Sequence, residues 1–326
     1  MLSSTEPQNQ TITTFLILGF PNTRKVEIVL FFVFLTMYLL TVTGNIIIII
    51  TVNTDIHLQT PMYFFLGNLS LLDIGYTSST VPNLLSILLM NVHTISLVGC
   101  ISQSYFFFFL GSAECFLLAV MAYDRYIAIC YPLRYPIIMN RRICVIFVII
   151  CWISGCLSPL VAALMLINLP FCGPKIINHF FCDIPPLLKL ACIDTSLIQQ
   201  IIFLLSAMVI LSTFLCTIIS YIYIGITILK IPSTHGRHKA FSTCASHLTV
   251  VSLYYGTVIF MYVSPTTRSS FDLNKVIAVI YSVVTPMLNP MIYTLRNQDM
   301  KIALTRIIFR TGIRKKDLDL SKEFHP

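Results

Sequence analysis

The sequence predicts an all-α membrane protein: a seven-transmembrane helix bundle with a short amphipathic eighth helix. Three observations lead to this prediction. Of the 326 residues, 56% are hydrophobic and only 10% are charged, whereas about a quarter of the residues in a soluble domain are charged. Apolar stretches long enough to cross a bilayer recur seven times. Most basic residues lie in the loops between these stretches and in the C-terminal tail, which explains the net charge of +8 without nucleic-acid binding.

The expected spans each reach the ~20 residues that a bilayer requires: 26–50, 62–90, 97–128, 143–167, 197–229, 241–263 and 273–295. No repeat with a period of 20–50 residues is visible, so a single bundle is expected. The predicted organisation is an extracellular N-terminal segment (1–25), the seven-helix domain (26–295), and a cytoplasmic amphipathic helix and tail (296–326). Basic residues alternate with apolar ones from Arg296 to Arg310, which predicts a helix lying on the inner leaflet.

The distribution of lysine and arginine predicts an extracellular N-terminus and a cytoplasmic C-terminus in the plasma membrane. Most of the 21 basic residues fall on the side that holds the C-terminal tail, as the positive-inside rule requires. No cleavable signal peptide is recognisable, so the first span is expected to direct insertion. Asn9 begins an Asn-Gln-Thr sequon and is a predicted glycosylation site.

Two acidic residues lie inside apolar spans, where ionisable groups are costly and commonly functional. Glu114 precedes Arg125 by 11 residues and Asp73 follows Pro61 by 12 residues, so both lie about 16–18 Å from the inner edge. Asn45 and Asn289 are candidates to complete a polar cluster. Two carboxylates at one depth require a shared proton or a cation, and we expect a sodium ion here, with no other cofactor. The alternative is that each acid is hydrogen-bonded separately.

Further polar residues cluster near the cytoplasmic ends of the spans. Asp124 and Arg125 end the third apolar run, and Tyr221 and His247 fall at a similar depth. They either form a conformational switch or merely mark the helix boundary and fill packing positions. In the last span, Pro286 and Pro290 flank Asn289, with Tyr293 following. Because proline removes a backbone donor, this segment is predicted to be deformable.

Four cysteines are predicted on the outer side, at positions 100, 172, 182 and 192. In an oxidising compartment they are expected to form disulfides, and their spacing alone leaves three pairings open.

These residues together resemble a vertebrate olfactory (odorant) receptor, within the rhodopsin-like G-protein-coupled receptors. The resemblance covers about residues 15–310 and rests on Gly44-Asn45, 61–66, 69–73, 121–126, Ser220-Tyr221, 239–248 and 286–290. The stretch 239–248, KAFSTCASHL, is the part that separates odorant receptors from other rhodopsin-like receptors.

The resemblance implies a mechanism and two disulfides. Arg125 would be held by Asp124 in the inactive state and released toward Tyr221 and His247 on activation, when a stimulatory G protein binds and cyclic AMP rises. Asp73 and Glu114 match the family's sodium-site acids. The implied disulfides are Cys100–Cys182 and Cys172–Cys192.

The resemblance also implies an odorant pocket within the bundle. The matching positions are Phe107, Phe108, Gly111, Ser112, Ser206, Tyr255, Ile259 and Tyr262. Their side chains predict small, mostly apolar ligands. Amine receptors place an aspartate in the outer half of the third helix, but residues 102–112 contain no acid, so a cationic amine is not expected.

Other classes fit less well. A transporter would show matching halves with broken helices, and an enzyme would place a nucleophile and base, or metal ligands, within reach. The sequence shows neither, so no enzyme is expected. A receptor of the same family that senses a metabolite outside the nose remains open, and a tissue expression profile would separate it.

Overall fold

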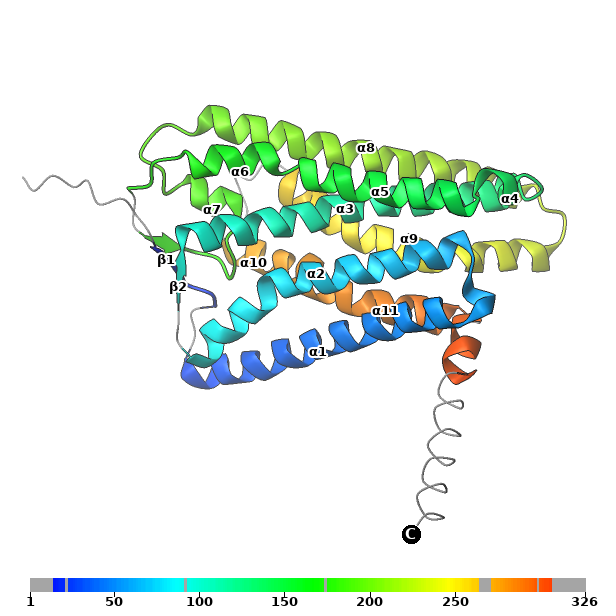
Figure 1. Cartoon of the computed structure of the whole chain (residues 1–326), viewed down its shortest axis with the longest axis horizontal. Helices are drawn as coiled ribbons and strands as arrows, with labels where there is room; N and C mark the ends of the chain where they lie inside the picture. The colour runs from blue at the N-terminus through cyan, green and yellow to red at the C-terminus, as the bar shows by residue number, and fades with distance from the viewer. Residues whose placement is uncertain are drawn as a thin grey trace, which may run out of the picture.

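The computed structural model describes residues 14–20, 23–90, 93–172, 175–263, 271–297 and 299–306. The elements, in chain order, are β1 (Thr14–Ile17), α1 (Arg24–Thr54), η1 (Ile56–Leu58), α2 (Pro61–Met90), β2 (Thr94–Ser96), α3 (Leu97–Cys130), α4 (Tyr135–Ile138), α5 (Arg141–Leu157), α6 (Leu160–Ile167), β3 (Ile176–Ile177), α7 (Ile184–Leu188), α8 (Ser196–Leu229), α9 (Thr234–Tyr262), α10 (Phe271–Val279), η2 (Ile280–Val284) and α11 (Thr285–Arg296). The long helices run side by side along the longest axis (Figure 1).

Six helical stretches in the described part of the chain are long and apolar enough to span a membrane: Arg24–Thr54, Leu97–Cys130, Arg141–Ile167, Ser196–Leu229, Cys244–Tyr262 and Leu273–Thr294. The remaining expected span, the second in the chain, corresponds to α2, which has 30 residues and is therefore about 45 Å long. It carries more polar residues, and it packs between α1 and α3, so fewer of its side chains need to face lipid. The helical architecture agrees with the predicted seven-helix bundle.

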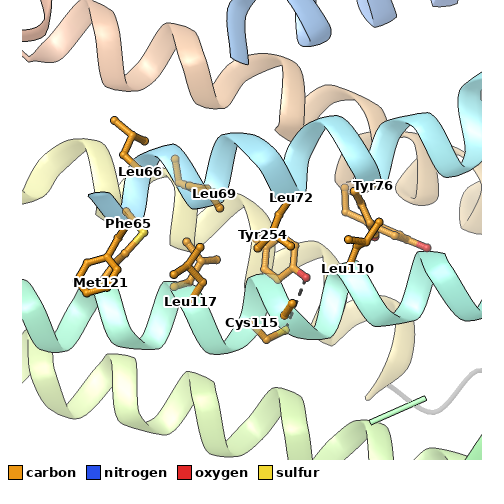
Figure 2. Packing of buried hydrophobic residues seen from close by; sticks show 14 of the residues in the cluster. Phe65, Leu66, Leu69, Leu72, Tyr76, Leu110, Cys115, Leu117, Met121 and Tyr254 are labelled. Carbon is orange, nitrogen blue, oxygen red and sulfur yellow. Dashed lines mark hydrogen bonds between the residues drawn. The ribbon is translucent and has the colours of Figure 1, made fainter. Parts of the chain in front are cut away.

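The third helix, α3, forms the centre of the bundle and packs against α2, α5, α6, α8 and α9. Figure 2 shows side chains of α2 and α3 meeting along their shared interface, with Phe65 beside Met121 at one end and Tyr76 beside Leu110 at the other. Tyr254 of α9 reaches the same interface at Cys115. The side chains of α3 are therefore fixed in position by packing against several neighbouring helices.

One end of the bundle is covered by a cap, which we define as β1, β2, β3, α7 and the described residues of the loop 168–195 (168–172 and 175–195). The strands form a three-stranded sheet in the order β2-β1-β3, antiparallel between β1 and β2 and parallel between β1 and β3. Phe15 and Ile17 of β1 are each 1% exposed. Residues 14–20 are thus an integral part of the cap, which the sequence analysis did not predict.

Several predicted boundaries differ from the structure. The sixth helix begins at Thr234 rather than residue 241, so it extends beyond its apolar stretch. The fourth span is divided into α5 and α6 at Pro159, because proline cannot donate a backbone hydrogen bond. The last span contains a π-helical turn, η2. Residues 299–306 are helical, as expected for the eighth helix, whereas Asn9 and the tail beyond residue 306 lie outside the described residues.

Candidate functional site: a cavity beside the central helix

A cavity lies beside α3, near the cap end of the bundle, and has a volume of about 70 Å³. This is several times the ~10–15 Å³ that one water needs on the same measure. Its lining combines aromatic, aliphatic and hydroxyl side chains: Tyr76, Phe107, Phe108, Gly111, Ser112, Cys115, Ser158, Pro159, Ala162, Ile184, Ile202, Leu205, Ser206, Val209, Ile210, Tyr254, Val258 and Tyr262. The lining contains no charged side chain, so the cavity suits a small neutral molecule.

Six of the eight predicted ligand-binding residues line this cavity: Phe107, Phe108, Gly111, Ser112, Ser206 and Tyr262. The other two, Tyr255 and Ile259, do not belong to its lining. Tyr255 is turned to the α3 backbone, where its hydroxyl donates to the carbonyl of Cys115 over 3.0 Å. Ile259 packs against the hydrophobic core.

Sequence reasoning missed the other twelve lining residues, of which Tyr254 and Ser158 carry hydroxyl groups that matter for the site. Tyr254 is fully buried and donates a hydrogen bond to the carbonyl of Gly111 over 2.7 Å. Ser158 lies 2.9 Å from Ser112, oxygen to oxygen. The Ser-Pro dipeptide at 158–159 could have indicated Ser158, because a proline within an apolar helix commonly kinks or interrupts it and exposes polar groups there.

An aromatic wall closes one side of the cavity. The ring of Phe107 stacks on Tyr76 at 4.6 Å and lies 4.5 Å from Phe181 of the cap. The ring of Phe108 meets Tyr262 edge-on at 5.6 Å, and the Tyr262 hydroxyl lies 2.7 Å from that of Tyr281 in η2. A ligand touching this wall therefore contacts α3, α9 and, through Tyr281, the π-helical turn.

The two buried acids lie deeper in the bundle. Asp73 and Glu114 are 0% and 1% exposed and close enough to interact electrostatically. The amide nitrogen of Asn289 donates to both Asp73 oxygens, at 3.1 and 3.0 Å, whereas Asn45 donates to two backbone carbonyls. The polar cluster thus joins α2, α3 and α11 around Asp73.

Several buried side-chain oxygens on α1, α3 and α11 have no hydrogen-bond partner in the described part of the chain: both Glu114 carboxyl oxygens, the amide oxygens of Asn45 and Asn289, and the Tyr293 hydroxyl. Unpartnered buried oxygens are costly, and oxygen atoms are the ligands that hard cations prefer. No group of three His, Cys, Asp or Glu residues is close enough to hold a metal among the described residues. Amide and hydroxyl oxygens would therefore have to complete a cation site.

The predicted switch residues gather at the end of the bundle opposite the cap. Arg125 is paired with the carboxylate of Asp124, which also accepts a 2.8 Å hydrogen bond from Tyr135 of α4. The Tyr221 hydroxyl lies 2.6 Å from Nδ1 of His247. The structure thus brings α8 and α9 together through Tyr221 and His247, while Arg125 remains bound within α3.

The last span carries Asn289, Pro290 and Tyr293 on α11. Pro290 packs against α1, where a Cβ added to Gly44 would lie 3.1 Å from the proline Cβ. Tyr293 is 1% exposed. The deformable segment predicted around these prolines is preceded by η2, where Thr285 donates to the carbonyl of Ile280 over 3.0 Å. A π-helical turn of this kind commonly occurs at functional sites.

Two disulfides fasten the cap, Cys100–Cys182 and Cys172–Cys192, and both are the pairings that the resemblance implies. Beneath them lie two buried titratable groups. Burial and the nearby Lys275 ammonium lower the pKa of His179 to about 3, so its ring is neutral. Burial raises the pKa of Asp183 to about 7, against the opposing effect of the hydrogen bond from the Ile184 amide.

Known proteins match this chain along most of its length. Residues 34–311 match the olfactory receptor family. The chain is 50% identical to human Olfactory receptor 11L1 over 306 residues, which cover 94% of this chain and 95% of that protein. It is 49% identical to human Olfactory receptor 11H4, covering 93% of this chain and 94% of that protein. It is 47% identical to Olfactory receptor 1468 of Rattus norvegicus, covering 95% and 98%.

These matches confirm the resemblance found in the sequence, and the multi-pass helical architecture agrees with them. The chain therefore belongs to the olfactory receptor family: it is an odorant-sensing, G-protein-coupled receptor and not an enzyme.

Proposed function

We propose that this receptor binds small, mostly apolar volatile ligands in the cavity beside α3 and activates a stimulatory, olfactory-type G protein, which raises cyclic AMP. The observation that carries the proposal is the cavity itself. It is lined by aromatic and aliphatic side chains, with hydroxyl groups as its main polar features. Such a lining favours neutral molecules of low polarity.

A ligand in the cavity can change the position of α9 relative to α3, because two tyrosines of α9 are hydrogen-bonded to the α3 backbone beside the cavity. Tyr254 lines the cavity and donates to the Gly111 carbonyl, and its neighbour Tyr255 donates to the Cys115 carbonyl. A ligand that binds more tightly when these contacts rearrange shifts the receptor toward the active state, by no more than its difference in affinity for the two states.

His247, the partner of Tyr221, lies near the middle of α9, about two turns from Tyr254 toward Thr234. When α9 moves outward there, Tyr221 is released and Arg125 exchanges Asp124 for Tyr221. The opening formed between α3, α8 and α9 receives the G protein. In this orientation the cap faces the extracellular side of the plasma membrane, and the C-terminal helix faces the cytoplasm, as the distribution of basic residues predicts.

The experiment is a cyclic AMP screen of a chemically diverse odorant panel in cells that contain the olfactory G protein. Arg125→Ala is expected to abolish odorant-evoked cyclic AMP while antibody labelling still detects the receptor at the surface. Full signalling by this variant contradicts the switch mechanism. A response that requires a different class of G protein contradicts the proposed coupling.

The buried acids are proposed to hold a sodium ion, with Asp73 and Glu114 supplying charge and neighbouring amide and hydroxyl oxygens completing the site. The unpartnered Glu114, Asn45 and Asn289 oxygens support this proposal. Purified receptor is expected to melt at a higher temperature in sodium chloride than in choline chloride, and Asp73→Asn and Glu114→Gln are expected to remove the difference. If both variants retain the sodium effect, the site is elsewhere.

A further inference from the structure

The break in the fourth spanning helix places a serine at the cavity wall. Ser158 caps the C-terminal end of α5, Pro159 follows it, and α6 begins at Leu160. Proline has no amide hydrogen and its ring crowds the preceding turn, so the regular hydrogen bonding of the helix is interrupted here. Both Ser158 and Pro159 line the cavity.

A close approach of two helices brings Ser158 to its partner. One turn before Ser158, Gly155 packs directly on α3: a Cβ at this position would lie only 2.6 Å from the Ala113 Cβ. The absence of a side chain lets α5 approach α3 closely. As a result, the Ser158 hydroxyl lies 2.9 Å from that of Ser112, the residue preceding Ala113.

The two hydroxyls carry two protons, but their shared hydrogen bond uses only one. Many helical hydroxyls in this protein donate to the carbonyl four residues earlier, as Thr217 and Ser220 do. In the described part of the chain, neither Ser112 nor Ser158 makes such a bond, and their mutual contact is the only hydrogen bond of either side chain. One hydroxyl proton of the pair is therefore available to the cavity.

Other polar groups at the cavity are engaged differently. The Tyr254 hydroxyl donates to the Gly111 carbonyl, and the Tyr262 hydroxyl is paired with Tyr281 of η2. Ser206, on the α8 side of the cavity, makes no side-chain hydrogen bond to the described part of the protein. Ser206 is therefore the natural competitor for a polar ligand atom and provides a matched comparison.

We propose that Ser112 and Ser158 form a ligand-binding subsite, the serine pair, that donates one hydrogen bond to the carbonyl oxygen of an aldehyde, ketone or ester. The inference rests on the proposed function of the cavity as the ligand site. Both serines are half-buried in the cavity wall. A hydroxyl proton without an acceptor is unfavourable there, and a carbonyl oxygen satisfies it. A hydrocarbon of the same shape leaves the proton unpaired, so the pair distinguishes oxygenated from pure hydrocarbon ligands.

The test uses the full-length receptor purified in lipid nanodiscs, with 2-hexanone and n-hexane as matched probes. Ligand binding to the folded state raises the melting temperature, which reports binding without requiring activation. We expect 2-hexanone to stabilise the wild type more than hexane does. The double variant Ser112→Ala/Ser158→Ala is expected to bind 2-hexanone about tenfold more weakly, as for the loss of one hydrogen bond, with hexane unchanged.

Each single variant is expected to lose less than the double variant, because the remaining serine keeps its own proton and can donate it alone. Ser154→Ala, one turn away on α5 and outside the cavity lining, controls for general effects of substitution. The ligand-free melting temperature of each variant reports whether the fold is retained.

Equal stabilisation of the wild type by both probes overturns the proposal. So does an unchanged 2-hexanone effect in the double variant, or a loss confined to Ser206→Ala. The cyclic AMP screen separates this result from the proposed function. A ketone that binds through the serine pair without any odorant raising cyclic AMP contradicts the coupling and leaves the subsite supported. Odorant-evoked cyclic AMP without any binding of 2-hexanone contradicts the serine-pair subsite and leaves the proposed coupling supported.

Discussion

The hydroxyl of Tyr221 lies 2.6 Å from Nδ1 of His247 and thereby links α8 to α9. The same tyrosine is the residue to which Arg125 is proposed to move on activation. In this structure, Arg125 instead bonds Asp124, including a 3.0 Å contact from Nε to Oδ2. Both members of the proposed active contact are thus occupied by other partners, as an inactive arrangement requires.

Weakening the hold on Arg125 is expected to raise activity without ligand. Asp124→Asn removes the charge that pairs with Arg125, and Tyr135→Phe removes the 2.8 Å hydrogen bond to the other Asp124 oxygen. We expect basal cyclic AMP, normalised to surface receptor, to rise several-fold for Asp124→Asn and less for Tyr135→Phe. Tyr131→Phe is the control, because Tyr131 contacts Tyr126 rather than Asp124. Unchanged basal activity in Asp124→Asn contradicts the proposal that the pairing of Arg125 with Asp124 stabilises the inactive state.

The approach of α5 to α3 predicts a strongly position-dependent effect of adding one methyl group. Gly155→Ala forces a Cβ to within 2.6 Å of the Ala113 Cβ, and the nearest backbone atoms lie at 2.8 Å. Overpacking of this kind costs about 1–3 kcal/mol, so the melting temperature should fall. Gly225→Ala is the matched control, because nothing lies within 4 Å of its added Cβ. Equal melting temperatures for the two variants would show that the helices separate freely.

Two buried groups in the cap give opposing pH dependences. Burial and Lys275 lower the pKa of His179 to about 3. The unfolded state therefore binds more protons below pH ~6.5, and this group's contribution to stability falls as pH decreases from ~6.5 toward 3. Burial raises the pKa of Asp183 to about 7, so its contribution falls as pH rises from ~4 to 7.

Between pH ~4 and 6.5 these two slopes oppose each other, each by up to ~1.4 kcal/mol per pH unit. We therefore expect Asp183→Asn to lower the melting temperature progressively on acidification below pH 6.5, relative to the wild type. His179→Gln should instead lose stability relative to the wild type as pH rises from 4 to 7. Melting curves of purified receptor across this range provide the measurement. Parallel pH profiles for both variants and the wild type would refute this assignment.

The two disulfides should contribute unequally to stability. Cys100–Cys182 joins residues 82 positions apart, and Cys172–Cys192 joins residues 20 positions apart. The chain-entropy model gives about 4.5 and 3.3 kcal/mol for these separations. Replacing both cysteines of the first pair with serine is expected to lower the melting temperature more than replacing both of the second. A larger effect of the second pair would mean that the cap depends on its local loop rather than on its attachment to α3.

Much of the architecture was predictable because a bilayer demands long apolar helices. What escaped prediction involved local irregularities. The strands at Thr14–Ile17 and Ile176–Ile177 are too short to show an alternating pattern. The π-helical turn at Ile280–Val284 carries no proline or glycine to mark it.

The residues of the candidate site were likewise predictable only in part. Six pocket residues followed from the resemblance, but adjacent tyrosines could not be ranked from sequence, and the structure places Tyr254, rather than Tyr255, at the cavity. A rotation of about 100° separates neighbouring side chains on a helix, so small errors in helix phase exchange them. Ser158 was missed because its partner, Ser112, is 46 residues away in the chain.

The central position of β1 in the cap has a consequence for how the protein is made. This strand comes from the beginning of the chain, yet its neighbours are β2 and β3, with Leu16 paired to Thr94 on one side and to Ile176 on the other. Ribosomes synthesise ~5–20 residues per second, so β1 emerges well before β3 is available. The cap is completed only after four spans have been inserted, and a chain delayed before that point exposes an unpaired strand edge.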